Sequence, residues 1–130
     1  MKTVIHTSLK DIEKTADLLY KSLKGGEVLA LTGSLGSGKT TFTQFLAKKL
    51  RIKHPVTSPT FVLMNIFQGK LLSKKVTTLY HLDLYRTRNY REIKALGITE
   101  VWGSKNTITI IEWADKIKTH LPKNAIHIKF

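Results

Sequence analysis

The chain has 130 residues, 42% of them hydrophobic, which is the length of one domain with enough apolar content for a folded core. It contains no cysteine, so disulfides and thiolate metal sites are excluded. No apolar run reaches the roughly 20 residues of a membrane-spanning helix, and the first six residues lack the apolar stretch of a signal peptide. We therefore expect one soluble, cytoplasmic domain over residues 1–130.

The charge balance is strongly basic. The chain has 22 Lys and Arg against 9 Asp and Glu, a formal charge of +13. Such an excess indicates a polyanionic partner such as nucleic acid. However, 18 of the basic residues are Lys and only 4 are Arg, the residue preferred for bidentate phosphate recognition. Biased codon usage produces the same Lys-rich balance, so charge alone leaves contact with a nucleic acid open.

Strand and helix patterns are interspersed along the chain. A short strand is predicted over 4–6, then a helix that begins at Ser8 and ends at Gly25-Gly26. The pattern continues with a strand (28–32), a helix (40–50), a strand (60–67), a turn at Gly69, a strand (76–82), a short helix (89–96), a strand (107–111), a helix (114–121) and a strand (125–130). This order predicts an α/β fold with a mainly parallel central sheet flanked by helices on both faces.

A phosphate-binding loop follows the strand over 28–32. Residues 33–40, GSLGSGKT, match the P-loop pattern G-x-x-x-x-G-K-[ST] between an apolar strand and an amphipathic helix. The glycines let consecutive N–H groups point into one concavity at a helix N-terminus, where anions bind. Lys39 is predicted to neutralise the β- and γ-phosphates, and the Thr40 hydroxyl to hold Mg²⁺. The loop therefore predicts a P-loop NTPase domain.

Two carboxylates end apolar strands and are candidates for the same site. Asp83 follows the strand over 76–82 and is predicted to orient Mg²⁺ directly or through water; the alternative is a capping or surface aspartate. His81 alternates with Asp83 on this strand and is expected only to support it. Glu112 follows the strand over 107–111 and is predicted to polarise the attacking water or hold the nucleotide. The alternative for Glu112 is a rim carboxylate paired with a lysine. Two further features each have two interpretations. Trp113 is expected either to stack near a base or to pack in the protein. Residues 57–61 are expected either to sense the γ-phosphate or to form a plain turn.

Aromatic and basic residues interleave just after Asp83, at Tyr85, Arg86, Arg88, Tyr90 and Arg91. Either Arg86 stabilises phosphate charge or the cluster contacts RNA; the alternative is a solvated helix face.

Motifs of the larger P-loop classes are missing from the sequence. The chain lacks the N-K-x-D and D-x-x-G motifs of GTPases and the L-S-G-G-Q signature of transporter ATPases. Its length is tight for a small kinase with a lid. A minimal ATPase remains.

Four segments carry a resemblance to a known family: GSLGSGKTTF (33–42), VTSPTFVL (56–63), YHLDLYR (80–86) and IIEWAD (110–115). In this order they resemble the TsaE family (older name YjeE), the ATPase of bacterial tRNA threonylcarbamoyladenosine biosynthesis. The resemblance covers nearly the whole chain. It implies an ATPase that works with a TsaD–TsaB complex and whose ATP turnover resets that complex between cycles, without transferring the threonylcarbamoyl group itself.

The resemblance also implies roles for individual residues. Thr40 and Asp83 look like the magnesium ligands, and Glu112 like the family's glutamate beside the nucleotide, so that Lys39, Asp83 and Glu112 form the expected catalytic set with ATP and Mg²⁺. The expected phosphate cradle is the backbone of Leu35, Gly36, Ser37, Gly38, Lys39, Thr40 and Thr41.

Two departures from the family pattern affect these expectations. Ser34 stands where the family commonly has an acidic residue, and relatives usually continue beyond Phe130, so contacts from that acid and that tail are expected to be missing. Two other functions remain open: a nucleotide-dependent binding module in which hydrolysis is incidental, and a small-molecule kinase.

Overall fold

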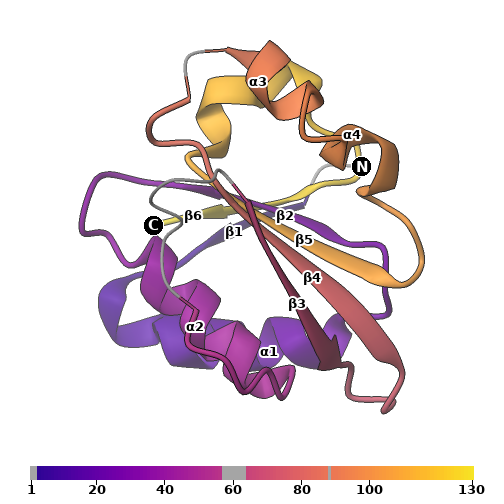
Figure 1. Cartoon of the computed structure of the whole chain (residues 1–130). Helices are drawn as coiled ribbons and strands as arrows, with labels where there is room; N and C mark the ends of the chain where they lie inside the picture. The colour runs from indigo at the N-terminus through magenta and orange to yellow at the C-terminus, as the bar shows by residue number, and fades with distance from the viewer. Residues whose placement is uncertain (1–2, 57–63, 88) are drawn as a thin grey trace.

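A six-stranded sheet forms the centre of the computed structural model, which describes residues 3–56, 64–87 and 89–130 (Figure 1). The strands are β1 (Thr3–His6), β2 (Val28–Thr32), β3 (Met64–Lys70), β4 (Val76–Asp83), β5 (Thr107–Glu112) and β6 (Ile126–Lys129). Their order across the sheet is β1-β6-β2-β5-β4-β3. All neighbouring pairs are parallel except the β3–β4 hairpin. The predicted mainly parallel sheet is confirmed.

Helices cover both faces of the sheet. One face carries α1 (Ile12–Ser22), which follows a 3₁₀ turn η1 (Leu9–Asp11), together with α2 (Lys39–Lys49). The other face carries α3 (Tyr90–Lys94), α4 (Ile98–Val101) and a 3₁₀ segment η2 (Ala114–His120), which lie together above the sheet in Figure 1. No helix within the described ranges is both long and apolar enough to span a membrane.

Side chains that alternate along the strands divide the core into two layers. Phe42 and Leu46 of α2 pack against Leu29 and Ile110 on one face. Ile111, the next residue along β5, packs on the other face with the α3, α4 and η2 layer. Strand β5 is buried over its whole length because it lies in the middle of a sheet that is covered on both sides. The carboxyl ends of β2, β4 and β5 therefore meet at one edge, where the loop after β2 lies.

Gly69 does not form the predicted turn. It lies within β3 and pairs with Thr77 of β4. A Cβ at this position would come within 2.7 Å of the Leu50 carbonyl oxygen, so glycine is needed for the close approach of α2's end to the strand. The chain turns instead at 71–75, where the Leu71 amide donates to the Lys75 carbonyl at 2.9 Å. Of the strand predicted over 60–67, residues 60–63 lie outside the described residues.

Helix boundaries differ from the prediction in two places. Ser8 precedes a 3₁₀ turn, and its hydroxyl donates to the Asp11 carboxylate at 3.0 Å instead of capping a backbone amide. The predicted helix over 114–121 is a 3₁₀ segment that is broken at Ile117, whose φ and ψ are −126° and 29°. By contrast, the helix predicted from Asn89 is capped there, because the Asn89 side chain accepts the Glu92 amide at 3.3 Å.

Candidate functional site

The loop over residues 33–38 joins the carboxyl end of β2 to the first turn of α2. Gly36 and Gly38 have φ of 76° and 110°, a conformation that L side chains rarely adopt. A Cβ on Gly38 would also lie 2.2 Å from Cδ1 of Ile12, so the loop rests directly on the start of α1. The Gly38 carbonyl accepts the Phe42 amide at 2.8 Å, which begins α2 at the predicted place. The strand–loop–helix context of a phosphate loop is therefore present.

Lys39 folds back over this loop. Its Nζ donates to the carbonyls of Gly33 at 2.7 Å and Ser34 at 2.9 Å, and lies 4.0 Å from the centroid of the Trp113 ring. No ion pair to Lys39 is found among the described residues. Burial lowers the pKa of this ammonium, against the opposing charges of Glu112, Asp83 and Asp115. A desolvated cation held by neutral carbonyls is suited to receive an anion at the helix N-terminus.

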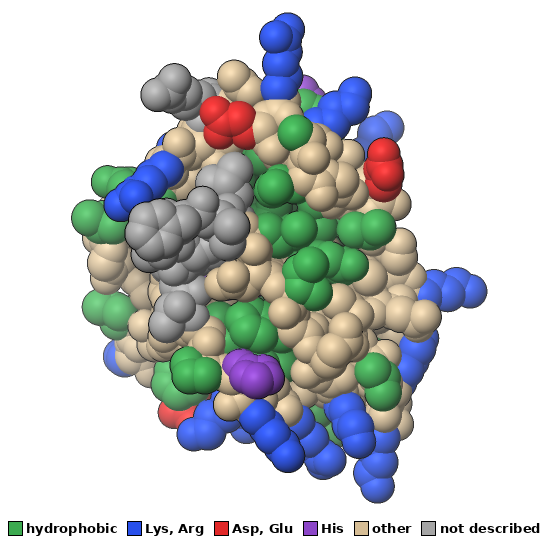
Figure 2. All heavy atoms as spheres, viewed as in Figure 1, with side chains coloured by type: hydrophobic (Ala, Val, Ile, Leu, Met, Phe, Trp, Pro, Cys, Tyr) green, Lys and Arg blue, Asp and Glu red, His purple; other side chains and the backbone are tan. Residues whose placement is uncertain are grey.

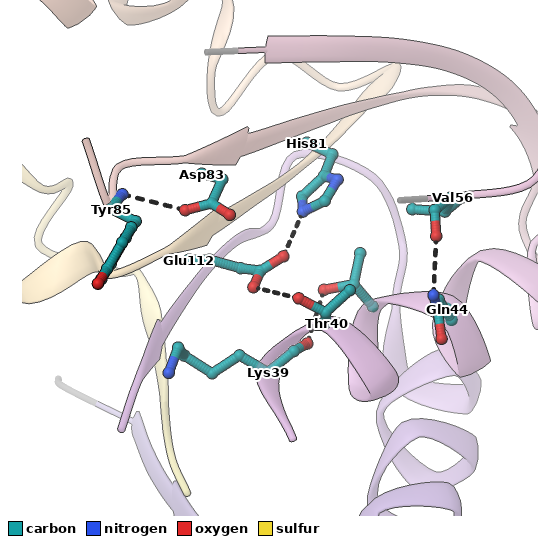
Figure 3. A network of polar contacts seen from close by, with 9 residues as sticks. Lys39, Thr40, Gln44, Val56, His81, Asp83, Tyr85 and Glu112 are labelled. Atoms are coloured by element: carbon teal, nitrogen blue, oxygen red, sulfur yellow. Dashed lines mark hydrogen bonds and ion pairs between the residues drawn. The ribbon is translucent and has the colours of Figure 1, made fainter. Parts of the chain in front are cut away.

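Glu112 links α2 to the sheet (Figure 3). Its Oε1 accepts the Thr40 hydroxyl at 2.8 Å, and its Oε2 lies 2.5 Å from Nε2 of His81. Glu112 is only 2% exposed and His81 is fully buried. The alternative of a rim carboxylate paired with a lysine is therefore wrong for Glu112, since its partners are a threonine and a histidine.

Asp83 lies beside Glu112 on the neighbouring strand, because the β4–β5 register pairs these two residues. It is only partly buried, and its Oδ1 accepts the Tyr85 amide at 3.0 Å, which shapes the chain as it leaves β4. The structure thus gives the two carboxylates different surroundings: Glu112 is enclosed and in contact with Thr40, whereas Asp83 is accessible to solvent. Both belong to the edge that carries the phosphate loop.

The donor set has the composition of a magnesium–nucleotide site. A threonine hydroxyl and two carboxylates lie together at the edge, whereas the described residues contain no cluster of three or more acidic, His or Cys side chains that could hold a metal alone. Mg²⁺ is commonly held in this way, by one or two carboxylates and a hydroxyl, with phosphates and water completing the coordination. The residues present therefore fit Mg²⁺ bound together with a nucleotide.

His81 contacts a different carboxylate from the one predicted. The sequence favoured His81 as a support for Asp83, two residues later on the same strand, but the ring contacts Glu112 on β5. The available signal was its position two residues before the strand's end, which puts it on the same face as Asp83. Its Nδ1 has no hydrogen-bond partner among the described residues.

The aromatic residues around the site pack against one another. The Tyr85 and Trp113 rings lie 5.1 Å apart, whereas Tyr90 stacks on His120 at 3.8 Å on the α3 side of the molecule. The structure thus places Tyr85 near the loop and Tyr90 away from it. The predicted sensing segment, residues 57–61, and Arg88 lie outside the described residues.

Comparison with known proteins identifies the family. The family model for "Threonylcarbamoyl adenosine biosynthesis protein TsaE" matches residues 6–130. The chain is 33% identical to the TsaE protein of Treponema pallidum over 95% of this chain and 87% of that one, and 38% identical to that of Aquifex aeolicus over 91% and 80%. The crystal structure of Bacillus subtilis YdiB superimposes with a TM-score of 0.69 at 30% identity, over 92% of this chain and 69% of that one. The chain, with its phosphate loop and paired strand-end carboxylates, belongs to the TsaE family.

Proposed function

We propose that this protein is a magnesium-dependent ATPase of tRNA threonylcarbamoyladenosine biosynthesis, acting in the cytoplasm with a TsaD–TsaB complex. The observation that carries the proposal is the contact between Thr40, at the start of α2, and Glu112, at the end of β5, beside a P-loop whose lysine has no paired carboxylate in the described part of the chain. Membership of the TsaE family, and the printed names of the relatives, support the role in tRNA modification.

The phosphates of ATP bind to the loop in this proposal. The backbone amides of residues 35–41 would donate to phosphate oxygens, with Lys39 supplying the positive charge. The Ser37 amide, which donates to the Ser34 carbonyl at 3.1 Å, would exchange that partner for a phosphate oxygen. Lys39 is held by two carbonyls and one aromatic face, which are neutral partners. A phosphate therefore offers its ammonium a stronger, charge-assisted interaction than its present ones.

The metal site is assigned to Thr40 and Asp83, with Glu112 as the carboxylate that already contacts the Thr40 hydroxyl. When bound, Mg²⁺ neutralises charge on the phosphates of the nucleotide. Thr40 must turn its hydroxyl hydrogen to suit whichever partner it has, since the same oxygen that donates to Glu112 would ligate the metal. Glu112 is then free to accept a proton or a hydrogen bond from water.

His81 fixes the orientation of Glu112. Its ring is fully buried and Nε2 lies 2.5 Å from the carboxylate, so this contact restrains the orientation of Glu112 beside Thr40. A carboxylate held in this way loses little freedom when it positions a water for attack on the γ-phosphate. We assign His81 as a positioning residue, and Lys39, Asp83 and Glu112 as the catalytic residues.

Multiple-turnover formation of threonylcarbamoyladenosine on tRNA tests the proposal. The reaction contains TsaD, TsaB and the enzyme that supplies the activated intermediate, and is run with this protein, without it, and with Lys39→Ala. We expect turnover with the wild-type protein alone, together with ATP hydrolysis that Lys39→Ala removes. Equal product in all three reactions would overturn the pathway role.

The same reactions separate the alternative functions. Full modification activity with negligible hydrolysis would support a nucleotide-dependent binding module instead of an ATPase. Transfer of the γ-phosphate to an added acceptor would identify a kinase.

A further inference from the structure

Basic side chains from separate segments of the chain meet at the end of the molecule opposite the phosphate loop. We call the basic pole the six residues Lys48, Lys49, Arg51, Lys70, Lys74 and Lys75, all of which are exposed. The first three lie at the end of α2, and the others at the β3–β4 hairpin. Figure 2 shows Lys and Arg side chains gathered along the lower edge of the molecule, where α2 ends and the hairpin turns in Figure 1.

Backbone contacts hold the two halves of the pole together. The Lys70 amide donates to the Leu50 carbonyl at 2.7 Å, which ties the end of β3 to the end of α2. Gly69 allows this approach, since a Cβ there would meet the same carbonyl oxygen. At the hairpin, the Lys74 amide donates to the Leu71 carbonyl at 2.9 Å and Leu71 is buried in the core. The six cations are therefore presented on a fixed backbone.

Acidic residues are scarce around the pole. The sequence contains no Asp or Glu between Glu27 and Asp83, a stretch that includes every residue of the pole. Asp17 on α1 pairs with Lys49 at 3.0 Å, and no other pole residue has a carboxylate partner in the described ranges. The Glu27 carboxylate accepts the Lys24 and Gly25 amides, so it is already occupied by the backbone. The positive charge of the pole is thus largely uncompensated.

Ordinary structural causes explain only part of this arrangement. A helix C-terminus favours cations, which accounts for Lys48 and Lys49 in the last turn of α2. An edge strand favours lysine, which accounts for Lys70 on β3. The same helix end accounts for Arg51, which directly follows the C-cap Leu50. Neither cause applies to Lys74 and Lys75 in the hairpin turn. The convergence of all six on one surface suits a polyanion.

We propose that the basic pole binds the phosphate backbone of structured RNA. The choice of RNA over other polyanions rests on the proposed function in tRNA modification. Five of the six residues are lysines and none is aromatic, so the pole offers point charges to phosphates and no stacking surface for bases. Contacts of this kind position an RNA without reading its sequence.

The pole is separate from the nucleotide site. Its segments flank the end of β3 and the start of β4, whereas the phosphate loop follows the carboxyl end of β2, and α2 runs from that loop to the pole. Phosphate contacts at the pole therefore do not involve Lys39 or Thr40. RNA binding is expected without ATP and without partner proteins.

Fluorescence anisotropy with a labelled, unmodified tRNA transcript tests the proposal, with the full chain and no nucleotide. The pole variant is Lys70→Gln/Lys74→Gln/Lys75→Gln. The matched control, Lys14→Gln/Lys94→Gln/Lys123→Gln, removes the same charge from exposed positions elsewhere. We expect the pole variant to weaken binding about tenfold or more at roughly 100 mM salt and to reduce the salt slope of log K by about 2–3, with the control near the wild type.

Three outcomes would overturn the proposal: no tRNA binding by the wild-type protein, equal losses in the two triple variants, or wild-type binding of polyglutamate with tRNA unable to compete. The first two would leave the charge without a specific RNA surface, and the third would assign the pole to an acidic protein.

The modification assay distinguishes this proposal from the proposed function. If the protein supports modification but does not bind tRNA, the proposal that the basic pole binds RNA is rejected and the pathway role is kept. Pole-dependent tRNA binding by a protein that does not support modification would reject the pathway role alone.

Discussion

The ammonium of Lys39 lies 4.0 Å from the centroid of the Trp113 ring, so the cation of the phosphate loop contacts the residue that follows Glu112. Trp113 holds this place with a φ of 60°, a left-handed conformation that is uncommon outside glycine. Trp113 directly follows β5 and Lys39 begins α2, so any change in the position of Lys39 alters the surroundings of Trp113.

MgATP is therefore expected to change the tryptophan emission of the protein, because a phosphate draws the Lys39 ammonium away from the Trp113 ring. The chain has two tryptophans, which makes the signal assignable. Titration of Trp102→Phe should retain the change and that of Trp113→Phe should lose it. A change of equal size in both variants would contradict the predicted movement of Lys39.

Replacing Glu112 with Gln should lower ATP turnover roughly 100-fold or more, because the carboxylate beside Thr40 is lost while the side chain keeps its size. Steady-state phosphate release with saturating Mg²⁺ measures this effect. Replacing Ser34, an exposed residue of the same loop, with Ala is the control and should leave turnover near the wild-type rate. Turnover of Glu112→Gln within a few-fold of the wild type would remove Glu112 from the catalytic set.

His81→Ala should lower the free energy of unfolding by about 3 kcal/mol, because it leaves a buried carboxylate oxygen of Glu112 without its partner and opens a cavity. Urea unfolding followed by circular dichroism measures the change. His54→Ala, at an exposed position, should have little effect on the same transition. Midpoints that shift equally in the two variants would show that the buried pair does not contribute to stability.

Gly38→Ala should destabilise the protein and weaken nucleotide binding, because its Cβ would lie 2.2 Å from Cδ1 of Ile12 and its φ is 110°. Ile12→Val removes that Cδ1 atom. In a double-mutant cycle, the cost of Gly38→Ala is therefore expected to be smaller in the Ile12→Val background. Gly97 also has a positive φ, but no atom lies within 4 Å of an added Cβ. Gly97→Ala therefore measures the conformational cost of alanine at a positive φ without a steric clash. Additive effects at positions 12 and 38 would contradict the close packing of loop and helix.

Asp17 should make stability depend on pH in the acid range. Hydrogen bonds from Lys49 and Lys21 lower the pKa of its carboxyl from the ordinary 3.8. A lowered pKa stabilises the folded state above the ordinary value, and that contribution is lost as the pH falls through the folded-state pKa. The melting temperature of Asp17→Asn should therefore be slightly below that of the wild type at neutral pH, and the two should converge below the ordinary pKa. A difference that persists in acid, or that is insensitive to salt, would contradict this account.

Elements of the fold could be predicted from the sequence where a short local pattern specifies them. Residues 28–32 and the loop after them were predicted as they occur, because an apolar run and a glycine-rich motif are short-range signals. The same reasoning failed at Gly69, since glycine marks a turn and a close backbone approach equally well, and only the position of Leu50 distinguishes the two. Helix α4, with four residues, is too short for a periodic signal.

The sequence predicted which residues lie at the candidate site, but not the contacts that they make with one another. Thr40 and Glu112 are 72 positions apart, and their hydrogen bond depends on β5 lying next to β2 in the sheet. Strand order is not encoded in any local pattern, so the contact could not be predicted from either residue. The role of His81 depends on the same order, because its partner lies on the strand beside its own.

The position of β2 has a consequence for how the chain acquires its structure. This strand lies early in the sequence, whereas its two neighbours in the sheet, β5 and β6, are the last strands of the chain. During synthesis β2 therefore remains unpaired until nearly the whole polypeptide has emerged, and its four buried residues stay exposed to water for that time. Assembly of the central strands must be a late step of folding. The phosphate loop at the end of β2 becomes rigid only when this assembly is complete.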